Sequence, residues 1–365
     1  MSAPTCRACG SAELHTVLDL GKVPAADHFP PAATAVHPDE TAHPLRMRLC
    51  AGCGLAQLAE DDTVTREPRG VEPRALRDQA ADAVGRVAAS GLLRGGSVRE
   101  FGSPHGGSWL PLLTRRGFAT TARDADVVID CFGLMHHADQ RAAVAARAEA
   151  TAPGGLLLIQ YHSFATIVAA RQWNALRHGH FAYYSLDALQ RLLMVAGMTV
   201  VTGWTFDLYG GTVLVAARHG AHESDESVRA IRAAEAPFTQ PAAARELQCA
   251  ADMHATALRE RLEYEKARGN RVYAYGAASR AVAVFSRAGI HRGLIGAVAD
   301  AAPAKRGRRM PGTDIPIIGP DELLAATPDL VLLTLPDLLE EVRADFPGLH
   351  GRWLIDDAAG PKSET

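Results

Sequence analysis

Two Cys-x-x-Cys pairs constrain the first part of this chain most strongly. Cys6 and Cys9 form one pair, Cys50 and Cys53 form the other, and a glycine directly follows each pair. Two intervening residues let both sulfurs of a pair reach one ion, and the glycine supplies the positive φ that such turns need. Two of these turns complete a closed tetrahedral shell of four thiolates. The spacing therefore predicts a structural zinc site, and two unrelated pairs of free thiols are the alternative.

Composition excludes several classes of partner. The net charge is −3, with 22% charged residues, so no basic field is available to hold nucleic acid or an anionic membrane. The N-terminus lacks an apolar signal core, and no apolar run approaches the roughly 18 residues of a membrane helix. Paired thiols are then metal ligands rather than disulfides, as expected in a reducing compartment. We expect a cytoplasmic protein that binds no nucleic acid and no membrane.

The length of 365 residues exceeds one comfortable hydrophobic core and suggests two or three domains. Changes in composition and periodicity along the chain indicate four segments. The predicted division is a zinc-binding module at 1–65, an α/β domain at 66–220, a helical linker at 221–270 and a Rossmann-like α/β domain at 271–365.

The α/β domain opens with a pattern typical of nucleotide-binding folds. Apolar residues recur at helical spacing over residues 71–93, and a strand is predicted to follow from Ser97. That strand ends near the acid Glu100, and Gly102, Gly106 and Gly107 precede the next helix. A strand, a glycine loop and a helix in this order bring backbone close to a nucleotide. Glycine-rich turns also occur for packing reasons alone, so this alternative stays open.

Histidines follow the next two predicted strands. A buried strand over residues 125–131 precedes His136 and His137, and a second one ends at Tyr161 and His162. Ligands of open α/β sheets lie outside the carboxyl ends of the strands. Two strand ends that deliver histidines to one edge therefore indicate a site there. Each histidine taken alone could equally be an ordinary loop residue.

The densest polar cluster lies between Trp173 and Leu186. Histidine can take up a proton near neutral pH, and tyrosine can hold a hydroxyl or polarise a carbonyl group. We expect this segment to line an active site; a polar loop with aromatic packing is the alternative. Its polar members are Arg177, His178, His180, Tyr183, Tyr184 and Ser185.

The rest of the chain reads as a hairpin, a linker and a second βαβ unit. Residues 206–217 suggest a hairpin at the sheet edge, and residues 224–268 form a helical pattern interrupted by prolines. Strands predicted from Val272, before Asp300 and after Pro328 imply a parallel sheet. Its first turn lacks the G-x-G-x-x-G pattern, so no NAD is inferred. A later basic loop is expected either to bind a diphosphate or to be solvated, and it carries Lys305, Arg306, Arg308 and Arg309.

Taken together, these segments resemble the SAM-dependent sugar C-methyltransferases, which act on TDP-linked 4-keto-deoxysugars. The resemblance spans nearly the whole chain. It rests on the two cysteine knuckles with D-L-G-x-x-P between them, E-F-G-S-x-x-G, R-H-G-H-F-A-Y-Y-S, Y-G-G-T, Y-G-A-A-S-R, and D-x-x-P-x-K-x-G-x-x-x-P-G-T-x-I-P-I.

The resemblance implies structural zinc, S-adenosylmethionine (SAM) in the middle domain and a nucleotide-linked sugar between the middle and C-terminal domains. It also implies that His180 abstracts the proton at sugar C3, beside the ketone. The remaining assignments are expectations for the same site. They are His178, His162 and Tyr183 beside the base, Glu100, Gly102, Gly106 and His136 for the cofactor, and Arg177, Tyr184, Lys305 and Arg308 for the substrate.

The chain departs from the family in ways that keep other functions open. Arg177 and Gly179 replace a tyrosine and a glutamate of the family, and Pro104 and His105 replace a polar residue and an acid. Too few residues precede the strand at Ala125 for a full second strand ending in a ribose-binding acid. We therefore expect a shortened methyltransferase-like sheet. A SAM-independent epimerase or isomerase, or a non-catalytic sugar-nucleotide-binding protein, are the alternatives to a C-methyltransferase.

Overall fold

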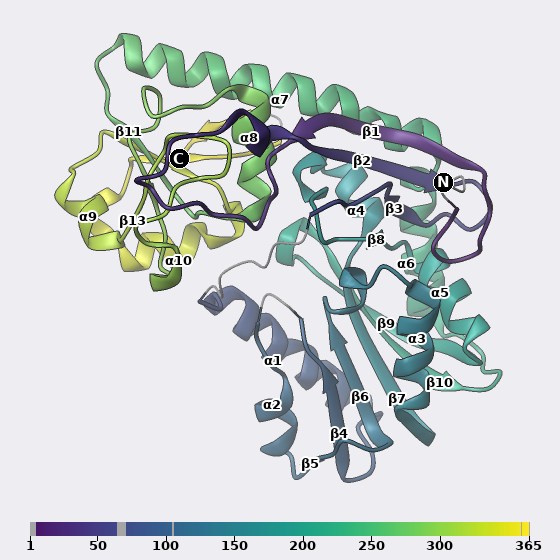
Figure 1. Cartoon of the computed structure of the whole chain (residues 1–365). Helices are drawn as coiled ribbons and strands as arrows, with labels where there is room; N and C mark the ends of the chain where they lie inside the picture. Colours follow the sequence, from purple (N-terminus) through teal and green to yellow (C-terminus); the bar gives the residue numbers. More distant parts are fainter. Residues whose placement is uncertain (1–4, 64–70, 104–105, 359, 365) are drawn as a thin grey trace.

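The computed structural model describes residues 5–63, 71–103, 106–358 and 360–364, which form three sheets joined by helices (Figure 1). The expected boundary between residues 65 and 66 lies outside the described residues. The first sheet is antiparallel and has the order β1-β2-β3-β8. Its strands are β1 (Leu14–Val23), β2 (His43–Cys50), β3 (Ala56–Leu58) and β8 (Ala182–Tyr183).

Strand β8 joins the zinc-binding module to the middle of the chain. It directly follows the R-H-G-H segment, and it pairs with β3 through Ala56↔Tyr183 and Gln57↔Ala182. The sequence pattern did not predict this strand, because two residues carry no detectable periodicity. The segment with the densest polar cluster is therefore held by the sheet of the zinc-binding module.

The second sheet has the order β5-β4-β6-β7-β10-β9. Strands β5, β4, β6 and β7 are parallel, and β10 is antiparallel to both β7 and β9, which confirms the predicted hairpin. The shortened sheet is confirmed as well, since its edge strand has only two residues. The strands are β4 (Ser97–Phe101), β5 (Ala119–Thr120), β6 (Ala125–Cys131), β7 (Thr151–His162), β9 (Met198–Phe206) and β10 (Thr212–His219).

The helices of the middle part flank this sheet. The helix expected over residues 71–93 is α1, which starts after Pro73. The Ser185 side chain accepts a hydrogen bond from the backbone N–H of Ala188 and so caps α5 at its N-terminus. The helices are α1 (Arg74–Ala89), α2 (Leu110–Thr114), α3 (Gln140–Glu149), α4 (Phe164–Ala169) and α5 (Leu186–Val195).

Two helices link the middle part to the C-terminal part. Helix α6 (Glu226–Glu235) is followed by a short 3-10 turn and then by α7 (Pro241–Ala267). Pro241 begins α7 instead of interrupting a helix, because the first turn needs no N–H donor at that position. Helix α7 packs beside β1 and reaches the C-terminal part (Figure 1).

The third sheet has the order β13-β12-β11-β14-β15-β16 and is parallel except for β16. The expected βαβ pattern is confirmed. Its strands are β11 (Val272–Tyr275), β12 (Val298–Ala299), β13 (Ile317–Ile318), β14 (Leu330–Leu333), β15 (Trp353–Ile355) and β16 (Lys362–Ser363). Its helices are α8 (Ser279–Ala288), α9 (Pro320–Ala325) and α10 (Leu339–Asp345).

One apolar cluster extends through all three parts. It includes Leu49 of the zinc-binding module, Ile159 of the middle sheet, Leu258 of α7 and Val298 of the C-terminal sheet. The parts therefore pack as one body rather than as beads on a flexible chain. Among the described residues, every helix is too short or too polar to cross a membrane.

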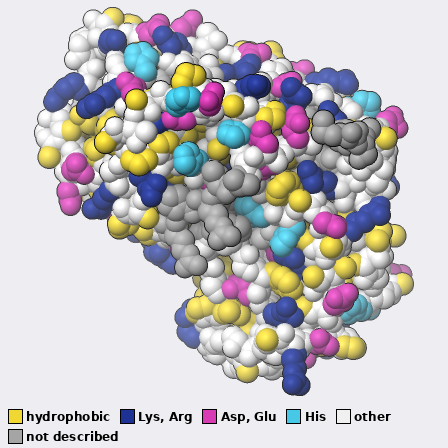
Figure 2. Space-filling view, in the orientation of Figure 1, with side chains coloured by type: hydrophobic (Ala, Val, Ile, Leu, Met, Phe, Trp, Pro, Cys, Tyr) yellow, Lys and Arg dark blue, Asp and Glu magenta, His cyan; other side chains and the backbone are white. Residues whose placement is uncertain are grey.

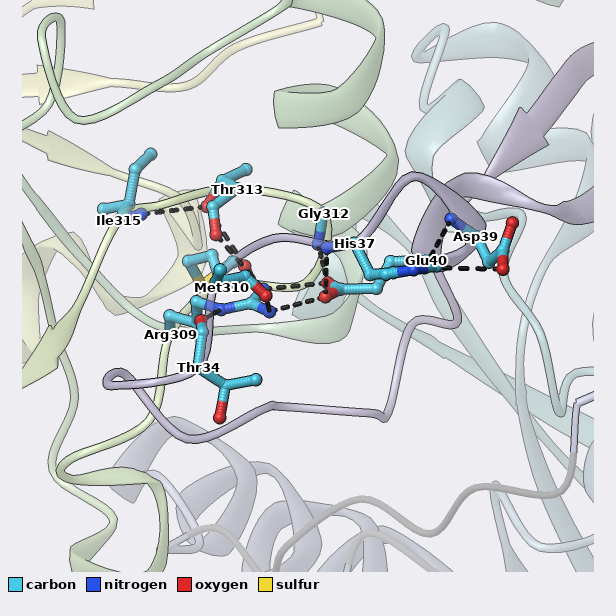
Figure 3. A network of polar contacts seen from close by, with 10 residues as sticks. Thr34, His37, Asp39, Glu40, Arg309, Met310, Gly312, Thr313 and Ile315 are labelled. Atoms are coloured by element: carbon cyan, nitrogen blue, oxygen red, sulfur yellow. Dashed lines mark hydrogen bonds and ion pairs between the residues drawn. The ribbon is translucent and has the colours of Figure 1, made fainter.

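A buried ion pair fastens the C-terminal sheet to the zinc-binding module (Figure 3). The Arg309 guanidinium binds both carboxylate oxygens of Glu40, with Nη1–Oε2 at 2.8 Å and Nη2–Oε1 at 2.5 Å. It also donates to the carbonyl oxygens of Thr34, Ala35 and Thr313. The hydrogen bonds from Arg309 to the carboxylate are the main reason why the pKa of Glu40 is lowered to about 2. Arg309 therefore has a structural partner and does not face a bound diphosphate.

Candidate active site

The zinc site is built by the two turns at the start of β1 and the end of β2. The four sulfur atoms of Cys6, Cys9, Cys50 and Cys53 all lie within 4.8 Å of one another. Cys6 Sγ is 3.4 Å from Cys53 Sγ, and Cys9 Sγ is 3.5 Å from Cys50 Sγ. Four sulfurs around zinc at about 2.3 Å are roughly 3.8 Å apart, while a disulfide is about 2.05 Å long. The donor set fits zinc and leaves no open ligand position for catalysis.

A cleft of about 290 Å³ lies where the carboxyl ends of the second and third sheets face each other. This position is the usual one for ligands of parallel α/β sheets. Helix α1 and helix α10 contribute further walls. Charged, polar and glycine residues from both sheets are among those that line the cleft. They include Glu72, Glu100, Gly102, Gly106, His162, Arg177, His180, Tyr183, Tyr209, Ser279, Arg280, Asp300 and Lys305.

His180 lies in this cleft and is 4% exposed. Its Nε2 accepts a hydrogen bond of 2.8 Å from Nε of Arg177. Because a guanidinium only donates, this bond requires a neutral imidazole with its proton on Nδ1. The ring of His136 meets the His180 ring edge-on, with centroids 4.5 Å apart. The structure thus places an imidazole that can accept a proton at the wall of the cleft.

The turn before His180 is held from two sides. Gly179 has φ +77°, and its N–H donates to Asp61 Oδ2 at 2.7 Å. Its carbonyl oxygen is 2.9 Å from Nδ1 of His136. His136, expected near the cofactor, therefore supports the turn and does not line the cleft. This glycine is required, since an L side chain rarely adopts that φ.

His162 and Tyr183 also line the cleft. Burial, followed by the charges of Arg280 and Arg177, lowers the pKa of His162 to about 3. His162 is therefore neutral at physiological pH. The Tyr183 hydroxyl donates to the carbonyl oxygen of Ala175 at 3.2 Å and accepts from the N–H of Arg177 at 3.1 Å. Burial raises the pKa of Tyr183 well above its usual value, so the phenol keeps its proton.

Three expected site residues point elsewhere. His178 Nε2 is 3.2 Å from the carbonyl oxygen of Pro44, and burial lowers the pKa of this histidine. The Tyr184 hydroxyl donates to the side chain of Gln140, because neighbouring residues of an extended segment face opposite sides. Arg308 Nη1 donates to the carbonyl oxygen of Phe29 at 2.7 Å. None of the three lines the described cleft.

The glycine loop forms one wall of the cleft. The Glu100 carboxylate accepts hydrogen bonds from Ser108 Oγ at 2.5 Å and from the Trp109 N–H at 2.6 Å, which closes the loop. Burial raises the pKa of Glu100. Gly102 and Gly106 leave open space next to their backbones. Pro104 and His105 lie outside the described residues.

The open backbone of the loop allows a cofactor such as SAM to approach closely. The neighbouring edge strand, β5, is only two residues long. Strand β5 ends at Thr120 and is followed by Thr121, Ala122 and Arg123, so no acid stands there. Glu72 is the nearest acid on the other side of the loop: a Cβ on Gly107 would lie 2.5 Å from its Oε1. The residues thus fit the cofactor at the glycine loop but lack the usual ribose partner at the strand end.

The C-terminal sheet contributes residues that the motif analysis did not assign. Ser279 Oγ accepts a hydrogen bond of 2.6 Å from Arg177 Nη1. The Arg280 guanidinium carbon lies 5.8 Å from the centroid of the Tyr209 ring. Both residues belong to Y-G-A-A-S-R, a motif of the family resemblance that predicts a strand–turn–helix unit but not which side chains reach the cleft. Lys305, which was expected here, donates to the carbonyl oxygen of Ala277 at 2.8 Å.

Charged side chains are mixed on one face of the molecule. On the face shown in Figure 2, basic and acidic side chains of the described residues are interspersed. This face offers no broad positive field, so an anion site in the cleft depends on its own half-buried arginines, Arg177 and Arg280.

The fold and site define a protein with a methyltransferase-type sheet between a four-cysteine module and a second Rossmann-like unit. Family models match each part in turn. A zinc-binding domain model matches residues 6–67, a methyltransferase domain model matches 74–202, and a C-methyltransferase C-terminal domain model matches 207–352. The expected resemblance is confirmed part by part: the chain is similar to a zinc-binding domain, a methyltransferase domain and a C-methyltransferase C-terminal domain.

A curated relative and several solved structures are similar to this chain. The C-methyltransferase NovU of Streptomyces niveus is 27% identical over 212 residues, which cover 56% of this chain and 50% of NovU. The chain thus spans about half the length of this relative. An O-methyltransferase family protein from Burkholderia thailandensis is 16% identical over 40% of this chain and 57% of its own, with a TM-score of 0.32. The N-methyltransferase NodS from Bradyrhizobium japonicum is 15% identical over 41% of this chain and 90% of its own, with a TM-score of 0.31.

Proposed function

We propose that this protein is a SAM-dependent C-methyltransferase that acts on a nucleotide-linked keto-deoxysugar. The observation that carries the proposal is the place of His180, in a cleft between the glycine loop and the C-terminal sheet. An imidazole there can take a proton from a carbon next to a ketone.

In the proposed reaction, His180 Nε2 accepts the proton from the sugar carbon beside the carbonyl group. The C–H bond breaks, an N–H bond forms, and the electron pair moves through the carbon onto the ketone oxygen. SAM bound at the glycine loop would supply an electrophilic methyl group: the C–O electron pair would return through the enolate to form the new C–C bond and restore the ketone, and the S–CH3 bond would break to leave the neutral thioether S-adenosylhomocysteine. The imidazolium then gives its proton to solvent.

The enolate needs positive charge near its oxygen. Arg177 stands where the family has a tyrosine, and Arg177, Arg280 and Lys305 all line the cleft. Their combined positive charge stabilises an oxyanion formed there, without requiring that Arg177 stay hydrogen-bonded to His180. His162 cannot serve as a proton donor near neutral pH, because its pKa is about 3. Tyr183, whose hydroxyl holds the backbone of Ala175, has a supporting role in positioning Arg177.

A sugar nucleotide suits the charges of the cleft. Arg177, Arg280 and Lys305 contribute positive charge from both sheets. The substrate diphosphate would lie toward α8, and the sugar ketone toward His180. The glycine loop forms the opposite wall of the same cleft, where the cofactor would bind.

A SAM-independent epimerase or isomerase is the second candidate. It is favoured by β5, which has two residues and is followed directly by Thr121, Ala122 and Arg123 rather than by an acid. The same base would form the same enolate, and reprotonation would complete the reaction. A non-catalytic sugar-nucleotide-binding protein would show neither proton exchange nor methyl transfer.

Calorimetric titration with SAM, together with mass spectrometry of a TDP-4-keto-deoxysugar incubated with enzyme and SAM, tests the proposal. SAM binding and a product heavier by one methylene unit are expected. Loss of SAM binding in Gly106→Val would assign the cofactor to the loop. Gly91→Val is the control, since Gly91 also has a positive φ and open space beside it but does not line the cleft. A protein that binds no SAM and yields no methylated product would contradict the proposal.

A further inference from the structure

The two arginines of the cleft, Arg177 and Arg280, are half-buried and differ from the fully buried arginines of the described chain. Arg147 and Arg309 are buried and each is paired with a carboxylate, Asp130 at 2.7 Å and Glu40 at 2.5 Å. By contrast, no described carboxylate lies within ion-pair distance of Arg177 or Arg280, the only two arginines that line the described cleft. Buried cations usually have anionic partners. Asp337 acts on Arg280 electrostatically from beyond ion-pair distance. The two guanidiniums therefore leave positive charge that a ligand can complete.

Arg177 connects the base to the other sheet. Its Nε donates to His180 Nε2 at 2.8 Å, and its Nη1 donates to Ser279 Oγ at 2.6 Å. The lone pair of His180 that would accept a proton is thus engaged by a guanidinium. As long as this hydrogen bond persists, His180 Nε2 cannot take a proton from a substrate carbon.

The second arginine lies on the same helix as Ser279. Arg280 follows it at the start of α8, a helix of ten residues whose first position has no side-chain cap. Burial, and then the charge of Arg177, lowers the pKa of Arg280. Two guanidiniums and the uncapped N–H groups of α8 therefore face the same part of the cleft. Such a set of donors matches the oxygens of a phosphate or diphosphate group.

We infer that Arg177 and Arg280 together bind the diphosphate of a nucleotide, and that the bound anion draws Arg177 away from His180. The inference rests on the proposed function, in which His180 is the base. A charge-assisted bond from guanidinium to phosphate is stronger than one to a neutral imidazole. Anion binding therefore frees Nε2, so that the base becomes active only when the nucleotide part of a substrate is in place.

Calorimetry of the zinc-loaded full chain with TDP, and separately with inorganic pyrophosphate, tests the anion site. Arg177→Gln and Arg280→Gln should each weaken binding of both ligands by roughly 10- to 100-fold, as expected for losing a hydrogen bond to a charged group. Arg287→Gln is the matched control, since Arg287 lies on the same helix and pairs with Asp252. Wild-type affinity in Arg280→Gln would overturn the inference.

NMR of the protein labelled with ¹⁵N-histidine tests the release of the base. His180→Gln assigns the His180 resonances. Pyrophosphate should shift the Nε2 resonance of the wild type toward its position in ligand-free Arg177→Gln, and should leave that of the variant unmoved. Bound pyrophosphate with an unchanged His180 resonance would overturn the inference. If Arg177→Gln fails to fold, Arg177→Lys replaces it, because lysine keeps the positive charge but lacks the paired N–H donors of the guanidinium.

These measurements need neither SAM nor turnover. A protein that binds pyrophosphate, shifts His180 and never methylates a sugar would therefore support this inference while contradicting the proposed function. A protein that methylates a sugar while His180 does not respond to pyrophosphate would support the proposed function and contradict this inference.

Discussion

At the scale of single residues, the Glu40–Arg309 pair shows how one side chain joins two parts of the molecule. Glu40 also accepts hydrogen bonds from the backbone N–H groups of His37 and Gly312 (Figure 3). Its carboxylate therefore has four donors, and the pair is almost fully enclosed. Removing one partner from such a pair leaves a buried charge without compensation.

We expect Glu40→Gln to lower the free energy of unfolding at pH 7 by roughly 3 kcal/mol. Because the folded-state pKa of Glu40 is about 2, below its usual 4.5, the stabilisation is present above pH 4.5 and is lost as the pH falls toward 2. Denaturant unfolding at several pH values measures both effects. Glu60→Gln is the control, since Glu60 is exposed, lies 3.5 Å from Arg46, and should contribute less than about 1 kcal/mol. Equal losses in the two variants would contradict this account.

The active-site segment shows what residue types can and cannot predict. The cluster of histidine and tyrosine correctly indicated polar residues at one place, and His180 and Tyr183 line the cleft. Which histidine faces the cleft depends on Gly179, whose turn is fixed by Asp61 far away in the sequence. Partners in distant segments leave no local pattern, so residue type alone could not tell His178 from His180, and only the family resemblance singled out His180.

At the scale of secondary-structure elements, β5 is the element that most limits the proposed cofactor site. The two-residue strand follows from the short segment before Ala125, which was visible in the sequence. Thr121, directly after the strand, donates its N–H to the carbonyl oxygen of Val98 and accepts from the N–H of Arg123. An aspartate can make the same two contacts.

We expect Thr121→Asp to restore a ribose partner and to tighten SAM binding by roughly 10-fold, because a hydrogen bond to a charged group contributes about 1.5–3 kcal/mol. Calorimetry with SAM measures the change. Thr121→Asn has the same shape without the charge and should change the affinity little. An aspartate variant that binds SAM no better than the asparagine variant would show that the ribose does not lie at this edge.

Long periodic elements were the easiest to predict. Most two-residue strands were missed, but β12, at the end of the apolar run before Asp300, was predicted. The sequence indicated α1, α7 and the strands β6, β7, β10 and β14, because each has an apolar pattern or run. Strands β8, β13 and β16 have two residues each and are defined only by their partners in the sheet. Since β8 attaches residues 177–184 to the first sheet, this missed element is the one that positions the proposed base, His180.

At the scale of the whole molecule, the zinc-binding module and the active site share one sheet. Strand β2 ends at Cys50, β3 pairs with β2, and β8 pairs with β3. The continuous apolar core also joins the parts. The metal is therefore coupled to the position of His180 although it lies outside the cleft.

Zinc removal should loosen the active-site segment before the middle sheet unfolds. With a chelator present, we expect faster amide hydrogen exchange in residues 177–184 and weaker TDP binding, while β6 and β7 stay protected. Mass spectrometry of hydrogen exchange measures this. Cadmium, which also binds four thiolates, should restore both properties if the metal is purely structural. Unchanged exchange of residues 177–184 after metal loss would contradict the coupling.

The most direct test of the central claim is deuterium incorporation next to the ketone. A TDP-4-keto-deoxysugar is incubated with the protein in D₂O, and NMR follows the proton on the carbon beside the carbonyl group. The account predicts enzyme-dependent exchange that His180→Gln slows by at least about 100-fold, while His178→Gln, whose ring contacts Pro44 outside the cleft, retains it. Exchange at the wild-type rate in His180→Gln would contradict the assignment of this histidine as the base.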